Sequence, residues 1–547
     1  MRLIKVKNKD IITIIKRLLI ALVFISISRI LIYPFNIRIW PQIEIDEFLL
    51  LWFQGLRFDL STIFMLVGPF LFFYSLPIPW RSKKYYVVFL EVLYFLPLIL
   101  GITVNFVDTA YFPFNAKRLT ANIFDFLGAG DDFWVLLPSF LRDFWLEFLL
   151  WALSIFLLLR IKKWIPIRQE AVKKPFIWYY CKHSLIFISA IAISILGIRG
   201  GIQLRPIGIN TAGYYASPAS TPILLNSAFS IIKTAGHENI EYKKFFTDKE
   251  LSNIYTPVQT YQPGQSALLP PPEQRSKNVV ILILESFSSE HTGIFNKGKE
   301  QGKYRGYTPF LDSLMQHSLV FNGFANGKRS IEAIPSILAS IPSLMNRSYI
   351  LSDYSNNEIN SLATILKKEA YYTSFFHGGS NGTMGFESFI YLAGFDDYFG
   401  RNEYNNDDDY DGHWGIFDEP YLHYFAEKLN TFPRPFLSAL FTLSSHHPYT
   451  IPEEHKGKFK EGNLEIQKAI EYTDFSLGEF FKHASNYDWY NNTLFVITAD
   501  HTSEAWFPEY QNRIGSYRVP IIFFTADGSL KGFREEIAQQ TDIMPSI

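Results

Sequence analysis

Five long apolar runs fill the first 200 residues of this 547-residue chain. Most of them approach the roughly 20 residues that an α-helix needs to cross the hydrocarbon core of a bilayer. The predicted spans are Leu18 to Tyr33, Leu60 to Ile78, Tyr86 to Phe106, Phe144 to Leu159 and Phe176 to Ile198. The chain therefore begins with a multi-pass α-helical membrane domain, and five crossings place its two ends on opposite sides of the bilayer.

Basic residues indicate the direction in which the spans cross. Lysine and arginine cluster before the first span, after the second and after the fourth, and these three clusters fall on one side. Cytoplasmic loops are enriched in these residues, so the N-terminus is predicted to lie inside and the chain after the fifth span outside the cytoplasm. No small-residue cleavage pattern follows the first apolar run, so a cleaved signal peptide is not expected. The predicted location is the cytoplasmic membrane.

Three ionisable side chains lie near the ends of the first two spans. Arg29 must reach the interface or find a partner. Arg57 and Asp59, at the mouth of the second span, either contact a lipid headgroup or act as separate interfacial charges. The second interpretation is favoured, because residues two apart do not share a helix face.

Composition divides the rest of the chain. Gly, Pro, Ser and Asn replace the long apolar runs between Gly200 and Arg275, which predicts a linker over residues 200–275. Within it, the apolar spacing of Thr221 to Thr234 predicts a helix that lies on the membrane or on the following domain. The predicted organisation is a five-span domain over 1–199, this linker, and an extracytoplasmic catalytic domain over 276–547.

Short apolar runs that end at polar side chains recur after residue 275. Asn278 to Leu284 is an unbroken apolar run of strand length, as expected of a strand buried on both faces of a mainly parallel sheet. Glu285 follows it directly. Three later runs end at His377, near His446 and His447, and at Asp500 and His501. Amphipathic helical stretches separate these runs, which predicts an α/β domain with a mainly parallel central sheet.

The polar residues at these strand ends are predicted to meet. In open α/β sheets the binding crevice lies beyond the carboxyl ends of the strands, although any one such residue alone is often a capping or turn residue. Glu285, Asp500 and His501 supply two carboxylates and an imidazole, which suit Mn²⁺ or Mg²⁺ and are tolerated by Zn²⁺. The single cysteine, Cys181, lies in the membrane part, so no cysteine cluster competes for a metal.

Ser330 follows a glycine-containing loop at the expected start of a helix. Free backbone N–H groups at a helix start favour a nearby phosphate, although serine also serves there as an ordinary N-cap. The two interpretations are compatible, because a metal can draw the proton from a serine hydroxyl and leave a nucleophile. A P-loop is excluded, since Asn322 occupies the position of its first glycine and Arg329 follows the lysine.

Taken in order, these residues resemble the lipoteichoic acid synthase family of membrane phosphoglycerol transferases, within the alkaline phosphatase and sulfatase superfamily. The resemblance rests on the five spans and on the motifs Leu284-Glu285-Ser286-Phe287, Gly327-Lys328-Arg329-Ser330 and Thr498-Ala499-Asp500-His501. It implies one divalent metal, most often Mn²⁺ with Mg²⁺ or Zn²⁺ as alternatives, held by Glu285, Ser330, Asp500 and His501. It also implies that Ser330 stands in the place of a nucleophilic threonine, and that the chain would continue beyond Ile547 into a further helix.

Other positions are expected to bind the substrate. These residues are His377, His446, Arg329 and Trp414. Both histidines match family histidines near the substrate phosphate, and His446 is preferred to His447 on the alignment of motifs. The chain departs from the family where a Trp-Asn-Arg-Asp-like patch is replaced by Asn381 to Glu387, so ethanolamine phosphate is an alternative to glycerol phosphate as the donor headgroup.

The predicted function is metal-dependent transfer of phosphoglycerol or phosphoethanolamine from a membrane phospholipid to a glycan or glycolipid acceptor, through a phosphoserine. The 51 basic and 52 acidic side chains balance, which gives no indication of a nucleic-acid partner. A phosphohydrolase or sulfuric ester hydrolase is the alternative, but Glu332 and Ile334 stand where a standard sulfatase motif needs Pro or Ala and Arg. A third possibility is an inactive sensor that keeps the fold, which an absence of bound metal would favour.

Overall fold

The chain divides into two compact units in a computed structural model. The model describes residues 9–40, 42–121, 123–124, 141–167, 177–237, 240, 243–254 and 277–547. Unit 1 comprises Met1–His237 and Leu351–Glu358, and unit 2 comprises Glu238–Ile350 and Ile359–Ile547. The first basic cluster up to residue 8 and the end of the predicted linker, residues 255–276, lie outside the described residues.

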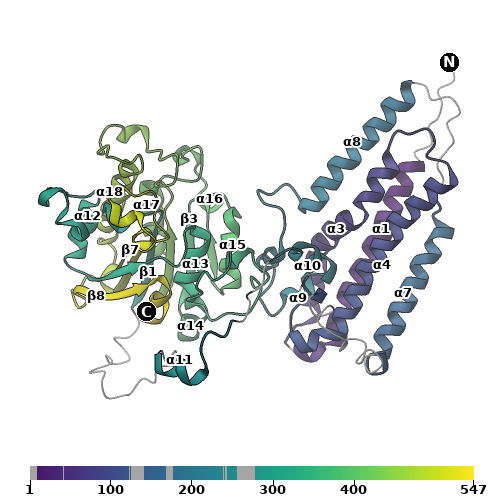
Figure 1. Ribbon diagram of the computed structural model, residues 1–547, viewed down its shortest axis with the longest axis horizontal. Helices are drawn as coiled ribbons and strands as arrows, with labels where there is room; N and C mark the ends of the chain where they lie inside the picture. The colour runs from purple at the N-terminus through teal and green to yellow at the C-terminus, as the bar shows by residue number, and fades with distance from the viewer. Residues whose placement is uncertain are drawn as a thin grey trace. The chain divides into compact units, whose positions relative to one another are not determined.

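Long helices pack side by side in unit 1 (Figure 1). They are α1 (Lys9–Ile30), α3 (Ile45–Ser75), α4 (Lys84–Asn115), α7 (Trp145–Trp164) and α8 (Ile177–Arg199). Buried aliphatic and aromatic side chains fill the space between them. Within the described residues, four helices are long and apolar enough to cross a membrane: Ile11–Phe35, Ile45–Ser75, Lys84–Pro113 and Tyr179–Arg199. These helices fit a membrane protein, and the multi-pass helical character of the predicted fold is confirmed.

Helix α7 corresponds to the predicted fourth span, Phe144 to Leu159. It has 20 residues but carries Glu147 near its start and basic residues in its last turn. Large apolar side chains such as Phe148 and Phe156 are exposed on it, as on a helix that faces lipid. The fifth crossing stays a prediction.

Buried ion pairs lie inside the helical unit. Arg29 donates from Nε to both carboxylate oxygens of Asp59, at 3.0 and 2.9 Å, and both side chains are fully buried. The sequence predicted Asp59 to be an interfacial charge, and this prediction was wrong. Asp59 is buried inside the helical bundle, where its ion pair with Arg29 compensates its charge. Two further buried pairs are Arg17–Glu91 and Arg118–Asp108.

Thr221 to Thr234 forms two short helices in place of the single helix expected. These are α9 (Thr221–Leu224) and α10 (Ser227–Thr234), which the Asn226 side chain separates by accepting the Phe229 N–H and capping α10. Both pack against α3, and α10 also packs against α4. Their apolar side chains are mostly buried, so this segment is part of the helical unit. The described residues before 277 also form the short helices α2 (Ile32–Phe35) and α11 (Asp248–Ile254).

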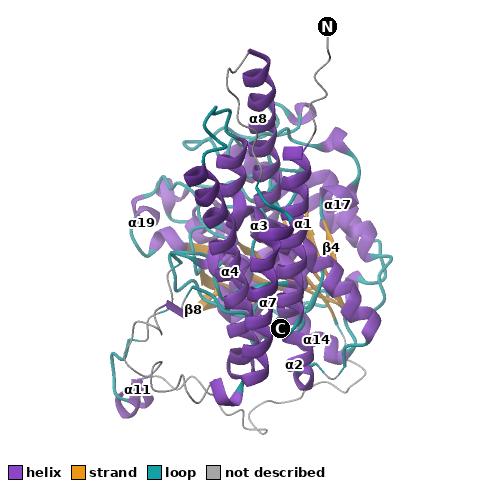
Figure 2. Ribbon diagram, turned by 90° about the vertical axis from the view of Figure 1, so that its right-hand side faces the viewer, coloured by secondary structure: helices purple, strands orange, loops and turns teal. Residues whose placement is uncertain are grey.

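An eight-stranded sheet lies at the centre of unit 2 (strands orange in Figure 2). In spatial order its strands are β4 (Asp397–Phe399), β3 (Tyr372–His377), β5 (Phe436–Phe441), β1 (Asn278–Leu284), β6 (Thr493–Ala499), β7 (Arg518–Thr525), β2 (Leu319–Phe324) and β8 (Gly532–Gln539). Among them only β7 runs antiparallel to its neighbours, which confirms the mainly parallel sheet. All seven residues of β1 are buried, because this strand is central and covered on both faces.

Helices connect the strands of unit 2. They are α12 (Pro309–Met315), α13 (Ser330–Ala339), α14 (Leu362–Leu366), α15 (Phe386–Leu392), α16 (Arg401–Tyr404), α17 (Asp418–Leu429), α18 (Gln467–Ala484), α19 (Pro508–Gln511) and α20 (Ile543–Ser546). Apolar side chains of α17 and α18 join those of β1, β5 and β6 in one core. Since β1, β3, β5 and β6 are parallel, their carboxyl ends meet at one edge of the sheet.

Candidate metal centre

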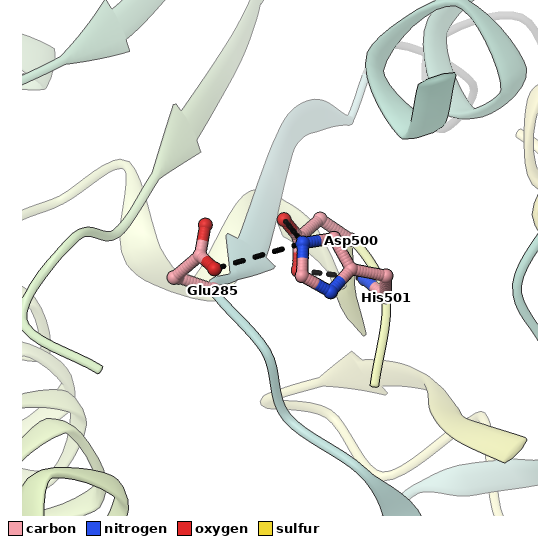
Figure 3. Close-up of side chains that lie close together, drawn as sticks. All are labelled: Glu285, Asp500 and His501. Carbon is pink, nitrogen blue, oxygen red and sulfur yellow. Dashed lines mark hydrogen bonds and ion pairs between the residues drawn. The ribbon is translucent and has the colours of Figure 1, made fainter. Parts of the chain in front are cut away.

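Three side chains at this edge of the sheet point toward one another (Figure 3). Glu285 follows β1, and Asp500 and His501 follow the neighbouring strand β6. His501 Nε2 lies 3.2 Å from Asp500 Oδ2 and 3.7 Å from Glu285 Oε1. One potential ligand atom from each residue lies within 4.8 Å of the other two. The structure thus brings these three predicted residues together.

Ser330 joins the cluster from the first position of α13. Its hydroxyl donates to Glu285 Oε2 at 3.2 Å, and its Oγ lies 3.4 Å from His501 Nε2. The serine is only 4% exposed. Each of the four residues named as metal ligands is therefore in contact with another member of the cluster.

The protein surroundings set the charges of the cluster. Burial, together with the Glu285 carboxylate, raises the pKa of Asp500 to about 7. Burial lowers the pKa of His501, but the two carboxylates outweigh burial and leave that pKa above its ordinary value. Two carboxylates in a buried position repel each other, and a cation between them removes this cost.

The unused atoms of the cluster suit a metal ion. Asp500 Oδ2 is buried and accepts no hydrogen bond from the described residues. His501 Nδ1 lies 2.9 Å from the Thr502 carbonyl oxygen, which requires a proton on Nδ1 and leaves Nε2 with the lone pair that a metal ligand needs. Two carboxylates, an imidazole and a hydroxyl are a donor set for Mn²⁺, Mg²⁺ or Zn²⁺. These residues therefore fit one divalent cation.

Hydroxyl groups that the sequence did not single out position Glu285. Thr442 Oγ1 accepts the Glu285 N–H at 3.0 Å, and Ser445 Oγ donates to the Glu285 carbonyl oxygen at 2.5 Å. Ser286 has a left-handed φ of 59°, uncommon for a residue other than glycine, and its N–H donates to Asp500 Oδ1 at 2.7 Å. These three hydroxyl residues follow β1 and β5 directly or within four residues, and this position in the sequence could have identified them as part of the site.

His377 lies at the end of β3, buried beside an aromatic ring. Its Nδ1 is 3.2 Å from the Tyr398 hydroxyl, and its ring stacks on Phe441. Burial lowers the pKa of His377 to about 3, so the imidazole is neutral near neutral pH. Within residues 277–547 no hydrogen bond or ion pair joins it to the four-residue cluster. A neutral imidazole can hydrogen-bond a phosphate but does not supply a proton as an acid.

The rings of Trp414 and His446 lie against each other at a tilt of 42°. Their ring centroids are 3.9 Å apart, and Trp414 Nε1 donates to the His447 carbonyl oxygen at 2.7 Å. Asp411 Oδ1 accepts three consecutive backbone N–H groups and thereby holds the loop that carries Trp414. The two predicted substrate-binding residues therefore form one surface built from separate loops.

Arg329 forms an ion pair with Glu332, and within the described residues its side chain forms no hydrogen bond or ion pair with the four proposed metal ligands. Its Nε donates to Glu332 Oε1 at 3.0 Å, and its side chain is 55% exposed. Lys328 contacts the loop after His501 instead, through Thr502 Oγ1 at 3.3 Å and the carbonyl oxygen of Ser516. In the described part of the chain the Lys328 ammonium group has no carboxylate partner. The structure favours Lys328 over Arg329 as the cation beside Ser330.

A second group of metal-ligating side chains lies elsewhere in unit 2. It consists of Glu419, Glu454 and His455. His455 Nε2 lies 2.6 Å from Glu419 Oε2, whereas the Glu454 side chain is 76% exposed. The Glu419–His455 pair accounts for this group without a metal.

Known proteins are similar in sequence to this part of the chain. The protein-family model described as Sulfatase matches residues 277–547. The match spans the α/β unit of the chain, which is therefore similar to the sulfatase family over these residues. The family resemblance inferred from the motifs is thereby confirmed, and the catalytic-type domain is called the sulfatase domain below.

Relatives of the whole chain include lipoteichoic acid synthases. The lipoteichoic acid synthase-like YvgJ of Bacillus subtilis (strain 168) is 26% identical over 274 residues, which cover 48% of this chain and 43% of that protein. Lipoteichoic acid synthase 1 of the same strain is 23% identical over 535 residues, 90% of this chain and 78% of that protein. The solved structure of the lipoteichoic acid synthase LtaP from Listeria monocytogenes matches with a TM-score of 0.43 and 23% identity, over 49% of this chain and 70% of that one. The first of these matches covers less than half of the relative's length.

Proposed function

We propose that this protein is a membrane-anchored, metal-dependent transferase. It moves a phosphoglycerol group, or alternatively a phosphoethanolamine group, from a phospholipid to a hydroxyl of a cell-envelope glycan or glycolipid. The observation that carries the proposal is the contact of Ser330 with Glu285 and His501 at the edge of the sheet. Similarity to a lipoteichoic acid synthase over 90% of the chain supports the lipid donor, and the helical unit supports a cytoplasmic membrane location with the sulfatase domain outside.

In the first step Ser330 acts as the nucleophile. Its Oγ forms a bond to the donor phosphorus, and the bond from phosphorus to the diacylglycerol oxygen breaks. The serine proton is released to water, and the leaving diacylglycerol oxygen takes a proton from His446. When bound, a divalent cation supplies charge stabilisation for the phosphate oxygens and lowers the pKa of the serine hydroxyl.

In the second step the acceptor hydroxyl attacks the phosphorus of the phosphoserine. Its proton passes to His446, and Ser330 Oγ leaves and regains a proton from water. The first N–H groups of α13 have no partner within the helix and therefore favour a phosphate at Ser330. The ammonium group of Lys328, which has no carboxylate partner within the described residues, adds positive charge beside the phosphate.

The match to the sulfatase family supports a second candidate function, the hydrolysis of a phosphate or sulfate ester. In that reaction water replaces the acceptor hydroxyl. Glu332 opposes the standard sulfatase chemistry. It stands where that chemistry needs Pro or Ala, and its carboxylate binds Arg329 and the Lys328 N–H.

A comparison of two labelled lipids tests the proposal. The full chain is incubated with phosphatidylglycerol or phosphatidylethanolamine and Mn²⁺, as wild type, Ser330→Ala and Ser330→Thr. We expect diacylglycerol release from one lipid, a loss of at least about a thousandfold in Ser330→Ala, and retained activity in Ser330→Thr, because threonine keeps the nucleophilic oxygen. Label transferred to an added glycan acceptor identifies a transferase, and label released as the free headgroup phosphate identifies a hydrolase. Release that is unchanged in Ser330→Ala would refute the nucleophile.

A further inference from the structure

Three arginines near the end of α8 have no carboxylate partner among the residues that the structure describes. They are Arg57, Arg199 and Arg205, and none forms an ion pair within the described residues. The buried arginines of the same unit differ, because Arg17, Arg29 and Arg118 each bind a carboxylate. The three unpaired arginines therefore leave a net positive charge in one region of unit 1.

Antiparallel packing of α3 on α8 brings Arg57 to this region. Ser61 Oγ of α3 donates to the Ile198 carbonyl oxygen at 2.8 Å, near the end of α8. One turn earlier in α3, Arg57 Nε donates to the Gly200 carbonyl oxygen at 2.8 Å. Arg57 thus lies where the chain leaves α8.

Gln203 links two of the guanidinium groups. Arg57 donates to Gln203 Oε1 at 2.8 Å, while Arg199 donates to the Gln203 carbonyl oxygen at 2.7 Å. Within the described residues, three of the five N–H groups of Arg57 donate hydrogen bonds, one of them to the Tyr215 hydroxyl, so two remain for a ligand. Arg205 follows two residues after Gln203 and makes no hydrogen bond within the described residues.

Apolar side chains alternate with these polar groups. Ile202 is 91% exposed and Leu204 is 61% exposed, directly after a helix that is apolar enough to span a membrane. Exposed aliphatic groups beside arginines suit the boundary between acyl chains and headgroups, where the apolar groups enter the lipid and the guanidinium groups reach the phosphates. By the predicted orientation this boundary belongs to the outer leaflet. Arginines are usually enriched on the cytoplasmic side of membrane proteins, so unpaired arginines are unusual at this position.

We propose that Arg57, Arg199 and Arg205 form a binding site for the headgroup phosphate of an anionic phospholipid of the outer leaflet. This proposal rests on the proposed function. The site would bind the lipid donor at the helical unit that anchors the sulfatase domain to the membrane. Guanidinium groups match phosphate oxygens with paired hydrogen bonds, and since none of the three arginines forms an ion pair in the described residues, their positive charge is available to a phosphate. Ile202 and Leu204 contact the acyl chains of the same lipid.

Lipid retention tests the site apart from catalysis. Full-length Ser330→Ala protein is loaded with equal amounts of phosphatidylglycerol and phosphatidylcholine, and native mass spectrometry measures the ratio of the lipids that stay bound. We expect a preference for phosphatidylglycerol that falls about fivefold in Ser330→Ala/Arg205→Gln, as one arginine near a lipid phosphate contributes roughly that factor. Arg205 has no partner to lose within the described residues, so this variant is expected to fold. Arg142→Gln is the matched control, because Arg142 is exposed and already paired with Asp143; it is expected to keep the ratio.

Two outcomes would overturn the proposal. One is an unchanged lipid ratio in the Arg205→Gln variant, and the other is displacement of bound phosphatidylglycerol by millimolar glycerol phosphate, which would show recognition of a free phosphate and not of a lipid. Diacylglycerol release is measured separately with intact Ser330. Arg205-dependent retention in a protein that releases no diacylglycerol would support the lipid site and refute the transferase.

Discussion

Replacing Asp500 by asparagine is expected to lower the affinity for Mn²⁺ at least about a hundredfold, since even changes to residues that only support metal ligands cost up to that factor. Within the described residues the buried Oδ2 atom accepts no hydrogen bond, as expected of a carboxylate oxygen that binds a cation. The amide would remove one negative charge and risk placing N–H groups toward His501 Nε2, which lies 3.2 Å away. Dialysed wild-type protein should retain one equivalent of manganese by elemental analysis, and the variant about a tenth or less.

Asp474→Asn is the matched control for this experiment. Asp474 is a fully buried carboxylate that accepts the N–H groups of Phe310 and Leu311 at the start of α12, and within the described residues it forms no hydrogen bond or ion pair with the proposed metal ligands. Its substitution should leave one equivalent of manganese bound. His455→Ala should also keep the metal, because the Glu419–His455 pair explains that group. Equal metal content in Asp500→Asn and wild type would contradict the assignment of the ligands.

Replacing Arg29 by methionine is expected to destabilise the helical unit by about 3–5 kcal/mol, because it leaves the Asp59 carboxylate buried without its cation. The guanidinium group also donates to the carbonyl oxygens of Ile223 and Trp52, so α9 and α3 lose a common partner. Thermal unfolding in detergent, followed by fluorescence, should show a midpoint lower by roughly 10 °C.

The double variant Arg29→Met/Asp59→Asn separates the charge from the packing. Neutralising Asp59 should recover part of the lost stability, since the uncompensated charge is gone. Arg142→Met breaks an exposed pair with Asp143 and should shift the midpoint by no more than about 1 °C, because exposed pairs contribute little. A midpoint for Arg29→Met that equals that of Arg142→Met would show that the buried pair does not hold the unit together.

The sequence predicted the fold best where a strand is buried on both faces. Asn278 to Leu284 was predicted with the bounds that β1 has, because a run of apolar residues without a break has to be covered on both faces. Glu285, Asp500 and His501 followed from the rule that carboxyl ends of parallel strands meet. Strand β2 was not predicted, because Asn322 and Gly323 interrupt its apolar run.

Contacts between distant residues were beyond the sequence. The helix-face argument separated Arg57 from Asp59, and the two indeed bind different partners, but it could not show that Asp59 is buried against Arg29. The same limit applies to Arg329, whose partner Glu332 lies one helical turn away and competes with any ligand. The break between α9 and α10 depends on the side chain of Asn226, which also donates to Asp59 and so serves the fold of the bundle.

Anomalous scattering from a manganese-soaked crystal of this protein tests the central claim most directly. We predict one strong peak within ligand distance of Glu285, Ser330, Asp500 and His501, at about 2.0–2.6 Å from their oxygen and nitrogen atoms. A peak at Glu419 and His455 instead, or none between the carboxylates that follow β1 and β6, would contradict the account.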